Sequence, residues 1–523
     1  MYLYALGMAG FLISTATASA GSFSFKPYQT YDVNSFAVAV AVGDVSGDGR
    51  DDVVMTTDYS GGGPNDFSMF VFVQRPDGQL GAPTKYAVSG PGMALVDLNL
   101  DGVLDIVVGH ETGVTTMINN PLRRPRTFGI RTFNADSDTA TIGALDVDRD
   151  GIQDFVALNT GGQLARIYYG DGTGAVRETS TLNQYAVSNE ADLKVGDLNN
   201  DGYSDLAMTS GKSTFNDSRF NVFIHDQVSG FMAPRVFDTG YDSSVGGVAI
   251  GDFNGDGRND LASSKSSNAP TYVSIFQQQA DGQFEAPTHM TSSDQPGPMV
   301  GSDIDGNGKD DLLVIHERGN VLGYYLQETS GLQAEILTPL PDAFRHGPQG
   351  LAVGDINHDG CKDVVIANYN HGLVWLHGNG CQVRSDLGVT VGLTSTTAAI
   401  RLEHVSGATP LQQPFVQIDL SIGSGTLQTG MLPAGCAIQS QTASTRRIDC
   451  LIDTLAPTAV TTLVVPLSVT ATRRDRLAVS ARASTDTPER SLINNQASKQ
   501  ITISPVSKQQ TLKLPAAVKP THR

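Results

Sequence analysis

Short apolar segments separated by polar turns recur between residues 22 and 381 and predict β-strands throughout this region. Each unit has a strand rich in β-branched residues, a polar loop, and a second strand such as residues 272–276. An Asp-Gly turn and an irregular strand containing Ala-Pro follow, and a Gly/Ala/Val strand such as residues 246–251 ends the unit. Proline is tolerated at a sheet edge, which places the Ala-Pro strand outermost. Four strands in about 50 residues, repeated seven times, predict an all-β fold, a seven-bladed β-propeller.

A nine-residue acidic loop, Asp-x-(Asp/Asn/Ser)-x-(Asp/Asn)-Gly-x-x-Asp, introduces the first of these strands in every unit. Successive copies start 49 to 55 residues apart. The sixth-position glycine permits the sharp turn that wraps a chain around an ion. An EF-hand would need Glu at position twelve, but the first two copies have Met55 and Val108 there. The pattern therefore predicts a strand–loop–strand hairpin. The copies begin at Asp44, Asp97, Asp146, Asp197, Asp252, Asp303 and Asp355.

The loops predict calcium sites, because Ca²⁺ takes six to eight oxygen ligands and alternate residues of a tight loop can aim oxygens at one point. The alternative is an Asx/Gly hairpin turn that holds no metal. The candidate ligands are the side chains at positions one, three, five and nine and the backbone carbonyl at position seven. They are Asp44, Ser46, Asp48, Arg50, Asp52; Asp97, Asn99, Asp101, Val103, Asp105; Asp146, Asp148, Asp150, Ile152, Asp154; Asp197, Asn199, Asp201, Tyr203, Asp205; Asp252, Asn254, Asp256, Arg258, Asp260; Asp303, Asp305, Asn307, Lys309, Asp311; and Asp355, Asn357, Asp359, Cys361, Asp363.

The charge of the chain agrees with metal binding. It has 54 acidic and 35 basic residues and a formal net charge of −19. The seven loops hold 22 of these carboxylates, which would repel one another strongly without a cation. Up to seven Ca²⁺ would bring the net charge to −5. Mg²⁺ suits the loops less, because it needs strict octahedral geometry and keeps its waters. The acidity argues against a nucleic-acid partner.

The first twenty residues favour export. Residues 2–20 are apolar and uncharged and end in Ala18-Ser19-Ala20, a small-x-small cleavage signal. We expect residues 1–20 to be a signal peptide cleaved after Ala20, and the mature protein to be secreted or held at the cell surface without a transmembrane span. The alternative is a short membrane anchor, for which the apolar core is too short to span a bilayer comfortably. Four cysteines suit an oxidising compartment.

One copy of the repeat resembles a known family. The run Gly-Asp-Phe-Asn-Gly-Asp-Gly-Arg-Asn-Asp-Leu-Ala at residues 251–262 resembles the FG-GAP repeat of integrin alpha chains and the related VCBS repeats of bacterial surface proteins. The resemblance covers about residues 22–381. It implies a calcium-binding propeller but not an activity, since such propellers include adhesins, sugar-binding modules and enzyme-attached domains.

The N-terminal segment predicts how the propeller closes. Residues 21–28 are similar to the outer strands at residues 78–83 and 282–287, and the last unit ends after its third strand. We therefore expect the N-terminal strand to be the fourth strand of the seventh blade, in a propeller domain of residues 21–383. Closing the ring in this way removes an exposed sheet edge.

The composition changes at about residue 384. Short strands with turn signals every 8–12 residues predict a β-sandwich over residues 384–503. The pattern of residues 432–436, Cys450 and residues 494–497 resembles Ig-like repeats of bacterial surface proteins. The basic tail, residues 504–523, is expected to be disordered.

The four cysteines allow three pairings. Cys436 and Cys450 flank a turn-like segment of the second domain, which favours a local disulfide. Cys361 lies in the seventh loop, and Cys381 follows a strand that returns to the same face, which favours Cys361–Cys381. The alternative is four free or buried thiols.

A ligand-binding face is expected at the rim opposite the acidic loops. Its candidates are Tyr59, His110, Glu111, His316, Arg318, Arg345, His346, Tyr369 and His371, although an ordinary solvated loop surface would also place them there. No nucleophile, phosphate-loop or metalloprotease motif is found.

Two functions remain open from the sequence. One is a non-catalytic adhesion or recognition module for an extracellular glycan or surface protein. The other is an extracellular polysaccharide-degrading lyase or hydrolase. Its general base would have to come from the His110-Glu111 pair or the run at residues 316–318.

Overall fold

The computed structural model describes residues 23–120, 127–134, 139–159, 164–183, 192–209, 219–226, 230–239, 245–265, 271–343, 347–382, 385–406, 410–456, 459–471, 473–485 and 495–503. The expected signal peptide and basic tail lie outside these ranges. The chain divides into two compact units, Met1–Gln382 and Val383–Arg523. All regular elements in the described ranges are β-strands, which confirms the predicted all-β class. None of the described residues forms a helix that could cross a membrane.

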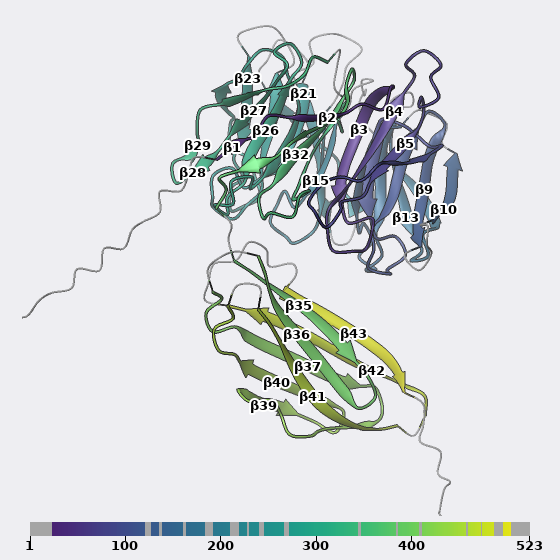
Figure 1. Ribbon diagram of the computed structural model, residues 1–523, viewed down its shortest axis with the longest axis vertical. Helices are drawn as coiled ribbons and strands as arrows, with labels where there is room; N and C mark the ends of the chain where they lie inside the picture. The colour runs from purple at the N-terminus through teal and green to yellow at the C-terminus, as the bar shows by residue number, and fades with distance from the viewer. Residues whose placement is uncertain are drawn as a thin grey trace, which may run out of the picture. The chain divides into compact units, whose positions relative to one another are not determined.

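The first unit contains, within its described residues, seven four-stranded antiparallel sheets (Figure 1). In chain order they are β3 (Phe36–Gly43), β4 (Asp52–Asp58), β5 (Met69–Phe72) and β6 (Thr84–Tyr86); β7 (Gly92–Val96), β8 (Asp105–His110), β9 (Gly113–Asn120) and β10 (Thr127–Asn134); β11 (Thr139–Leu145), β12 (Asp154–Asn159), β13 (Leu164–Gly170) and β14 (Val176–Asn183); β15 (Leu193–Gly196), β16 (Asp205–Thr209), β17 (Arg219–Phe223) and β20 (Arg235–Asp238); β21 (Val245–Gly251), β22 (Asp260–Lys265), β23 (Tyr272–Phe276) and β24 (Thr288–Thr291); β25 (Pro296–Ser302), β26 (Asp311–His316), β27 (Val321–Tyr325) and β30 (Ile336–Pro339); and β31 (Leu351–Gly354), β32 (Asp363–Asn368), β33 (Gly372–Leu376) and β2 (Gln29–Tyr31).

The first strand of each sheet contacts the first strand of the next, and β31 of the seventh sheet contacts β3 of the first. Apolar side chains follow the same succession. Seven buried clusters each combine residues of two consecutive sheets. One of them joins the seventh sheet to the first, with Trp375 packed in the same cluster as Phe72. The first strands are rich in Gly, Ala and Val, because small side chains let seven strands approach one another.

The seventh sheet takes its outer strand from the other end of the unit. β2 pairs with β33 in the register Gln29↔Trp375, and β1 (Ser24–Phe25) pairs with β34 (Gly378–Asn379). The rings of Phe23 and Phe25 meet that of Tyr324 edge-on, with centroid distances of 6.1 and 5.3 Å. The N-terminal segment is thereby held to both the sixth and seventh sheets. Two further short hairpins are β18 (His225–Asp226) with β19 (Gly230–Phe231) and β28 (Gln327–Glu328) with β29 (Gly331–Leu332).

The second unit has two antiparallel sheets around one apolar cluster. Alternate residues of β41 are buried and exposed, which is typical of a strand with one face in a core. One sheet is β35 (Asp386–Leu393), β36 (Thr397–Ser406), β41 (Val460–Thr470) and β38 (Thr426–Thr429), and the other is β39 (Cys436–Gln441), β40 (Thr445–Leu451), β37 (Phe415–Ile422), β42 (Asp475–Ser484) and β43 (Gln496–Ile503).

Both predicted cysteine pairs are at disulfide distance. Cys361 and Cys381 lie in the first unit, with their Cα atoms 5.7 Å apart. Cys436 and Cys450 are opposite each other on β39 and β40, with Cα atoms 4.0 Å apart. Each unit therefore holds one disulfide.

Candidate functional site

The seven acidic loops have one backbone geometry. Each connects the first and second strands of its sheet. In all seven, the sixth-position glycine donates its N–H to the first aspartate, as Gly102 does to Asp97 Oδ2 at 2.8 Å. Gly102 has φ +84°, and a Cβ there would meet no neighbouring atom. Backbone conformation, not lack of space, is what requires glycine at this position.

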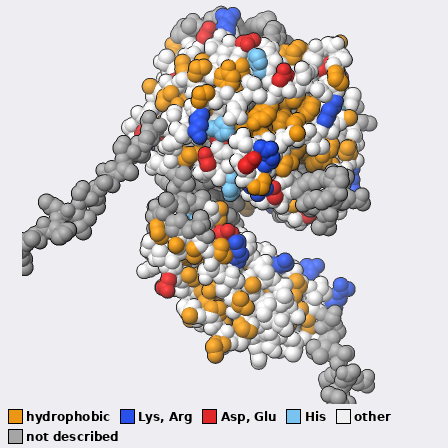
Figure 2. Space-filling model, in the orientation of Figure 1, with side chains coloured by type: hydrophobic (Ala, Val, Ile, Leu, Met, Phe, Trp, Pro, Cys, Tyr) orange, Lys and Arg blue, Asp and Glu red, His pale blue; other side chains and the backbone are white. Residues whose placement is uncertain are grey.

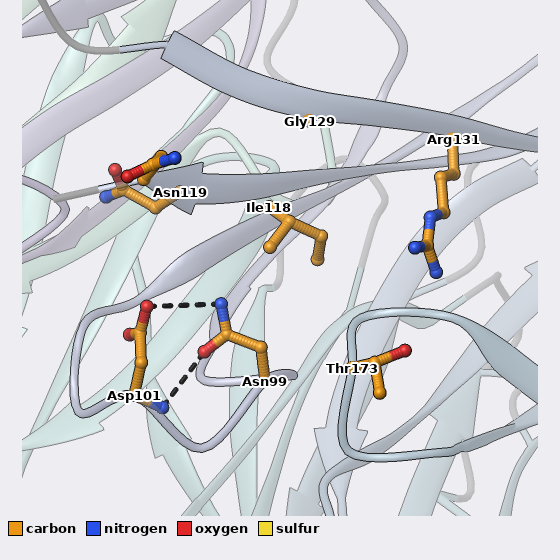
Figure 3. A pocket seen from close by; sticks show the side chains of 8 residues that line it. Asn99, Asp101, Ile118, Asn119, Gly129, Arg131 and Thr173 are labelled. Carbon is orange, nitrogen blue, oxygen red and sulfur yellow. Dashed lines mark hydrogen bonds between the residues drawn. The ribbon is translucent and has the colours of Figure 1, made fainter. Parts of the chain in front are cut away.

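The oxygens of positions one, three and five converge inside the turn. In the second loop, Asn99 Oδ1 accepts the N–H of Asp101 at 2.9 Å, and Asp101 Oδ1 accepts the N–H of Val103 at 3.0 Å. Asn99 Nδ2 also donates to Asp101 Oδ2 at 3.2 Å (Figure 3). The fourth, fifth, sixth and seventh loops repeat the bond between positions three and five. Each turn is thus preformed by its own side chains.

The ninth aspartate has a structural function that the sequence did not indicate. It is fully buried in all seven loops. Its Oδ1 accepts a backbone N–H at the end of the third strand in every sheet, over distances of 2.6–2.9 Å. In the second loop, Asp105 Oδ1 accepts from Asn119 and Oδ2 accepts from Leu98. The ninth aspartate therefore ties the acidic loop to the middle of its sheet.

Burial raises the pKa of these aspartates, and the neighbouring loop carboxylates raise it further. The pKa is about 6 for Asp105 and Asp154, about 8 for Asp311, and about 7 for the other four, which are Asp52, Asp205, Asp260 and Asp363. A cation inside the turn would oppose this shift by favouring the charged carboxylates.

The donor atoms of the loops fit a hard divalent cation. Carboxylate oxygens of Asp146, Asp148 and Asp154 lie within 4.8 Å of one another, and those of Asp303, Asp305 and Asp311 do the same. The buried Oδ1 of Asp146 has no hydrogen-bond partner among the described residues. In both clusters the carboxylates come from positions one, three and nine, so these side chains would hold the ion, together with the side chain at position five and the carbonyl at position seven.

Basic side chains balance part of the loop charge. Arg50 pairs with Asp48, Arg258 pairs with Asp256, and Arg177 pairs with Asp148. These pairs are partly exposed, so each contributes little to stability. On the face seen in Figure 2, acidic and basic side chains of the first unit are interspersed with hydrophobic ones.

A cavity adjoins the second loop (Figure 3). It has a volume of about 560 Å³ and lies between this loop, the outer strands of the second sheet and a turn of the third sheet. Arg131 of β10 is the one basic residue among those that line it, and no sequence motif indicated this site. Its lining residues are Asn99, Asp101, Ile118, Asn119, Asn120, Gly129, Arg131 and Thr173.

Two of the expected ligand-face residues belong to an aromatic cluster, which we define as Phe36, Tyr59, Phe67 and Tyr369; Phe36 and Tyr369 are half-buried. The ring of Tyr59 stacks on Phe67, with centroids 6.0 Å apart, and the two residues are 56% and 52% exposed. The ring of Tyr369 stacks on Phe36 at 4.0 Å. Phe36 lies opposite Asp58, the residue before Tyr59, so both stacks occur at the junction of the first and seventh sheets.

A polar group accompanies the cluster on the seventh sheet. His371 Nε2 lies 3.0 Å from Asp342 Oδ1, and Asn370 Nδ2 donates to Asp342 Oδ2 at 3.1 Å. The bond from His371 lowers the pKa of Asp342.

Phe67 has φ +49°, a strained conformation for a bulky residue, and it holds the ring outward.

The other expected ligand-face residues that the structure describes lie elsewhere. His110 and Glu111 lie at the turn of the second sheet, where His110 Nε2 contacts Thr115 Oγ1 at 3.0 Å. Arg318 is exposed on the sixth sheet. Arg345 and His346 lie outside the described residues.

His316 requires a correction. It was expected at the exposed rim, but it is fully buried. Its Nε2 lies 2.6 Å from Glu335 Oε1, whose partner oxygen accepts the N–H of Ser293. The side chain faces the interior because β26 is covered on both faces.

A model of the FG-GAP-like repeat matches four overlapping segments of the chain, residues 146–208, 197–263, 252–314 and 303–366. Each match starts at the first aspartate of an acidic loop and extends past the next loop. The first two loops have the same hydrogen bonds but precede the matched region. No curated protein matches the chain. Residues 146–366 therefore carry four tandem FG-GAP-like repeats.

Proposed function

We propose that the first unit is a calcium-stabilised, seven-bladed β-propeller that serves as a non-catalytic recognition module for an extracellular glycan. The observation that carries the proposal is the sevenfold repetition of one preformed oxygen-lined loop, once in each sheet. The succession of sheet contacts that returns from β31 to β3 supports the closed ring. Bound Ca²⁺ would neutralise the converging carboxylates of each turn.

The second unit fits an Ig-like sandwich that accompanies the propeller outside the cell. Its two antiparallel sheets, which share one core, support this assignment. One disulfide in each unit supports an oxidising environment. These disulfides and the apolar N-terminal segment support the proposal that the protein is secreted or displayed at the cell surface.

The aromatic cluster is the proposed glycan contact. Sugar rings stack on exposed aromatic faces, and neighbouring amide and carboxylate groups bond their hydroxyls. Tyr59 and Phe67 present such faces, and the His371–Asp342–Asn370 group supplies polar atoms from the adjoining sheet. Neither histidine segment favours the enzymatic alternative, since His316 is buried and His110 bonds to threonine.

A glycan array tests the recognition proposal. The full chain in calcium should bind a restricted set of glycans, and Tyr59→Ala and Phe67→Ala should each weaken binding about tenfold, because stacking contacts contribute of the order of 1 kcal/mol or more. Phe415→Ala is the matched control, because Phe415 is an exposed aromatic residue of the second unit. Equal binding by Tyr59→Ala and the native chain would refute the assignment of the site. Turnover of a uronate polysaccharide would refute the non-catalytic function.

A further inference from the structure

One glutamine side chain connects three sheets across the inner strands of the first unit. Gln349 precedes β31, and its Nε2 donates to the carbonyl oxygens of Met93 and Ile142, both at 3.0 Å. Its Oε1 accepts the N–H groups of the same two residues at 2.7 and 3.1 Å. Its own carbonyl accepts the N–H of Val40 at 2.9 Å. A residue of the seventh sheet is therefore bonded to the first, second and third sheets.

This crossing forms one end of a cavity of about 420 Å³. The cavity is lined by Gln349 and by the first strands of six sheets, and its walls are mainly Val, Leu, Ile and Ala side chains. It extends from the level of Gln349 toward the acidic loops, because the lining residues Val42, Leu95 and Val353 each stand two positions before a first aspartate. The amide nitrogen and oxygen of Gln349 are both bonded to backbone groups. The side chain therefore closes this end of the cavity and has no hydrogen-bond donor left for a ligand.

A single charged side chain, that of Lys194 on β15, lines this apolar cavity. Lys194 pairs with Ala207 on the second strand of its sheet. At the matching register positions, the other six sheets have only small or apolar residues: Ala41, Ala94, Gly143, Ala249, Val300 and Ala352. A lysine here is an exception to the repeat, and the propeller fold does not require it.

A buried carboxylate positions the ammonium group. Lys194 Nζ lies 2.8 Å from Asp192 Oδ1, and the side chain of Asp192 is fully buried while that of Lys194 is 21% exposed. Asp192 also accepts the backbone N–H groups of Leu193 at 2.9 Å and Val248 at 3.2 Å. These two dipoles offset part of its charge. An ammonium has three donors, and its one hydrogen bond within the described residues goes to Asp192, which leaves two donors for a ligand.

We infer that this cavity binds a small aliphatic monocarboxylate. The carboxylate would lie beside Lys194, just above the Gln349 crossing, because a charged donor is the strongest partner for a carboxylate in an apolar site. The aliphatic body would lie against the inner strands, where burial of apolar surface favours it. The volume is within the range of small-molecule sites. The inference depends on the inner strands alone, and neither calcium nor the aromatic cluster contributes to it.

Octanoate is a suitable probe, with octan-1-ol as the uncharged comparison. Calorimetric titration and thermal melting of the full chain in calcium should show a single saturable octanoate site and a higher Tm. Lys194→Met should weaken octanoate binding at least about tenfold, because it removes the cation and keeps the apolar stem. Lys499→Met, a change on the exposed strand β43 of the second unit, is the matched control and should leave binding unchanged.

Two further variants keep the test decisive if Lys194→Met fails to fold with Asp192 left unpaired. The double change Asp192→Asn with Lys194→Met removes the whole pair. Ala94→Leu fills the cavity while the pair stays intact, and it should abolish octanoate binding. Equal affinity in the native chain and a folded variant lacking Lys194, or octanol binding as tightly as octanoate, would overturn the inference. The inference would also be overturned if octanoate binding did not saturate at about 10 mM. A Kd of that size corresponds to a binding free energy of only about −3 kcal/mol.

Discussion

The two units share one secondary-structure class and one disulfide each, but they bury different chemistry. The first unit distributes its apolar residues over seven clusters, each shared by two neighbouring sheets, and adds a buried aspartate to every sheet. The second unit has one cluster between two sheets. Among its described residues, none of the buried side chains is a carboxylate. A β-fold alone therefore does not dictate the source of stability.

This difference has a physical reason. A sandwich closes its core with two large apolar faces, so its turns can remain ordinary polar loops. Seven small sheets expose many turns and have small faces, so each sheet gains from a fixed internal connection. The ninth aspartate supplies it by bonding the acidic loop to the third strand. The negative charge needed for that connection would then be balanced by a cation in the turn.

Removal of calcium should separate the two units most clearly. In calorimetry of the full chain, EDTA should lower the melting transition of the first unit sharply and leave that of the second unit in place. Each proposed site would contribute about 2.7 kcal/mol at a hundredfold excess of calcium over its Kd, so several sites together would exceed the effect of any single substitution. Added Mg²⁺ should not restore the transition. Unchanged melting in EDTA, with less than one ion per chain by native mass spectrometry, would contradict the calcium proposal.

Loss of one ninth aspartate should be the next largest effect. Asp105→Ala leaves the buried N–H groups of Asn119 and Leu98 without their acceptor. Each unsatisfied group costs about 1–3 kcal/mol, so the first unit should lose about 2–6 kcal/mol by denaturant titration. Asp419→Ala, which removes an exposed pair with Arg447 in the second unit, should cost about 1 kcal/mol or less. Similar losses for both variants would show that the ninth aspartate is not an anchor.

The disulfides offer a symmetrical test with a smaller effect. Cys361→Ser with Cys381→Ser should destabilise only the first unit, and Cys436→Ser with Cys450→Ser only the second. The sequence separations of 20 and 14 residues predict about 3 kcal/mol each from chain entropy. The chain segments closed by the two disulfides are similar in length. Each double substitution should therefore lower the unfolding free energy of its own unit by a similar amount. A shift in the wrong unit would show that the two units do not melt independently.

The smallest expected effect is on pH dependence in metal-free protein. The folded pKa values of the ninth aspartates lie at about 6 to 8, above the unfolded value near 3.9. The folded state then binds more protons, so the stability of the first unit should rise as the pH is lowered from 8 to 5. In the second unit, the pKa of Asp475 is lowered by Ser424, so its contribution is lost only below the normal Asp range. The Tm of the second unit should therefore stay constant between pH 5 and 8.

Melting of exhaustively dialysed chain at pH 5, 6.5 and 8 measures this dependence. With calcium restored, the trend in the first unit should weaken or reverse, because the ion needs deprotonated ligands. Parallel pH curves for both units in the absence of metal would contradict the assigned burial of the ninth aspartates.

The sequence alone determined the features that depend on local pattern. The period of the acidic loops, the glycine at their sixth position and the alternation of apolar residues determined the all-β class and the position of every loop. The cysteine pairing also followed, because strand direction is a local property that alternates along a sheet. The exposure of Tyr59 also agrees with its place in a loop at a strand end, since such loops lie at the surface.

Only the tertiary structure decided which distant groups meet. Position nine remains a predicted ligand, but no sequence pattern indicates its additional bonds to a third strand 14 or more residues away. His316 follows an apolar run like other rim residues, yet a neighbouring strand covers it and Glu335 binds it. Gln349 and Met93 are 256 residues apart, and no local pattern brings them together. A periodic sequence specifies each sheet, whereas the contacts between sheets depend on how all seven pack around the same inner strands.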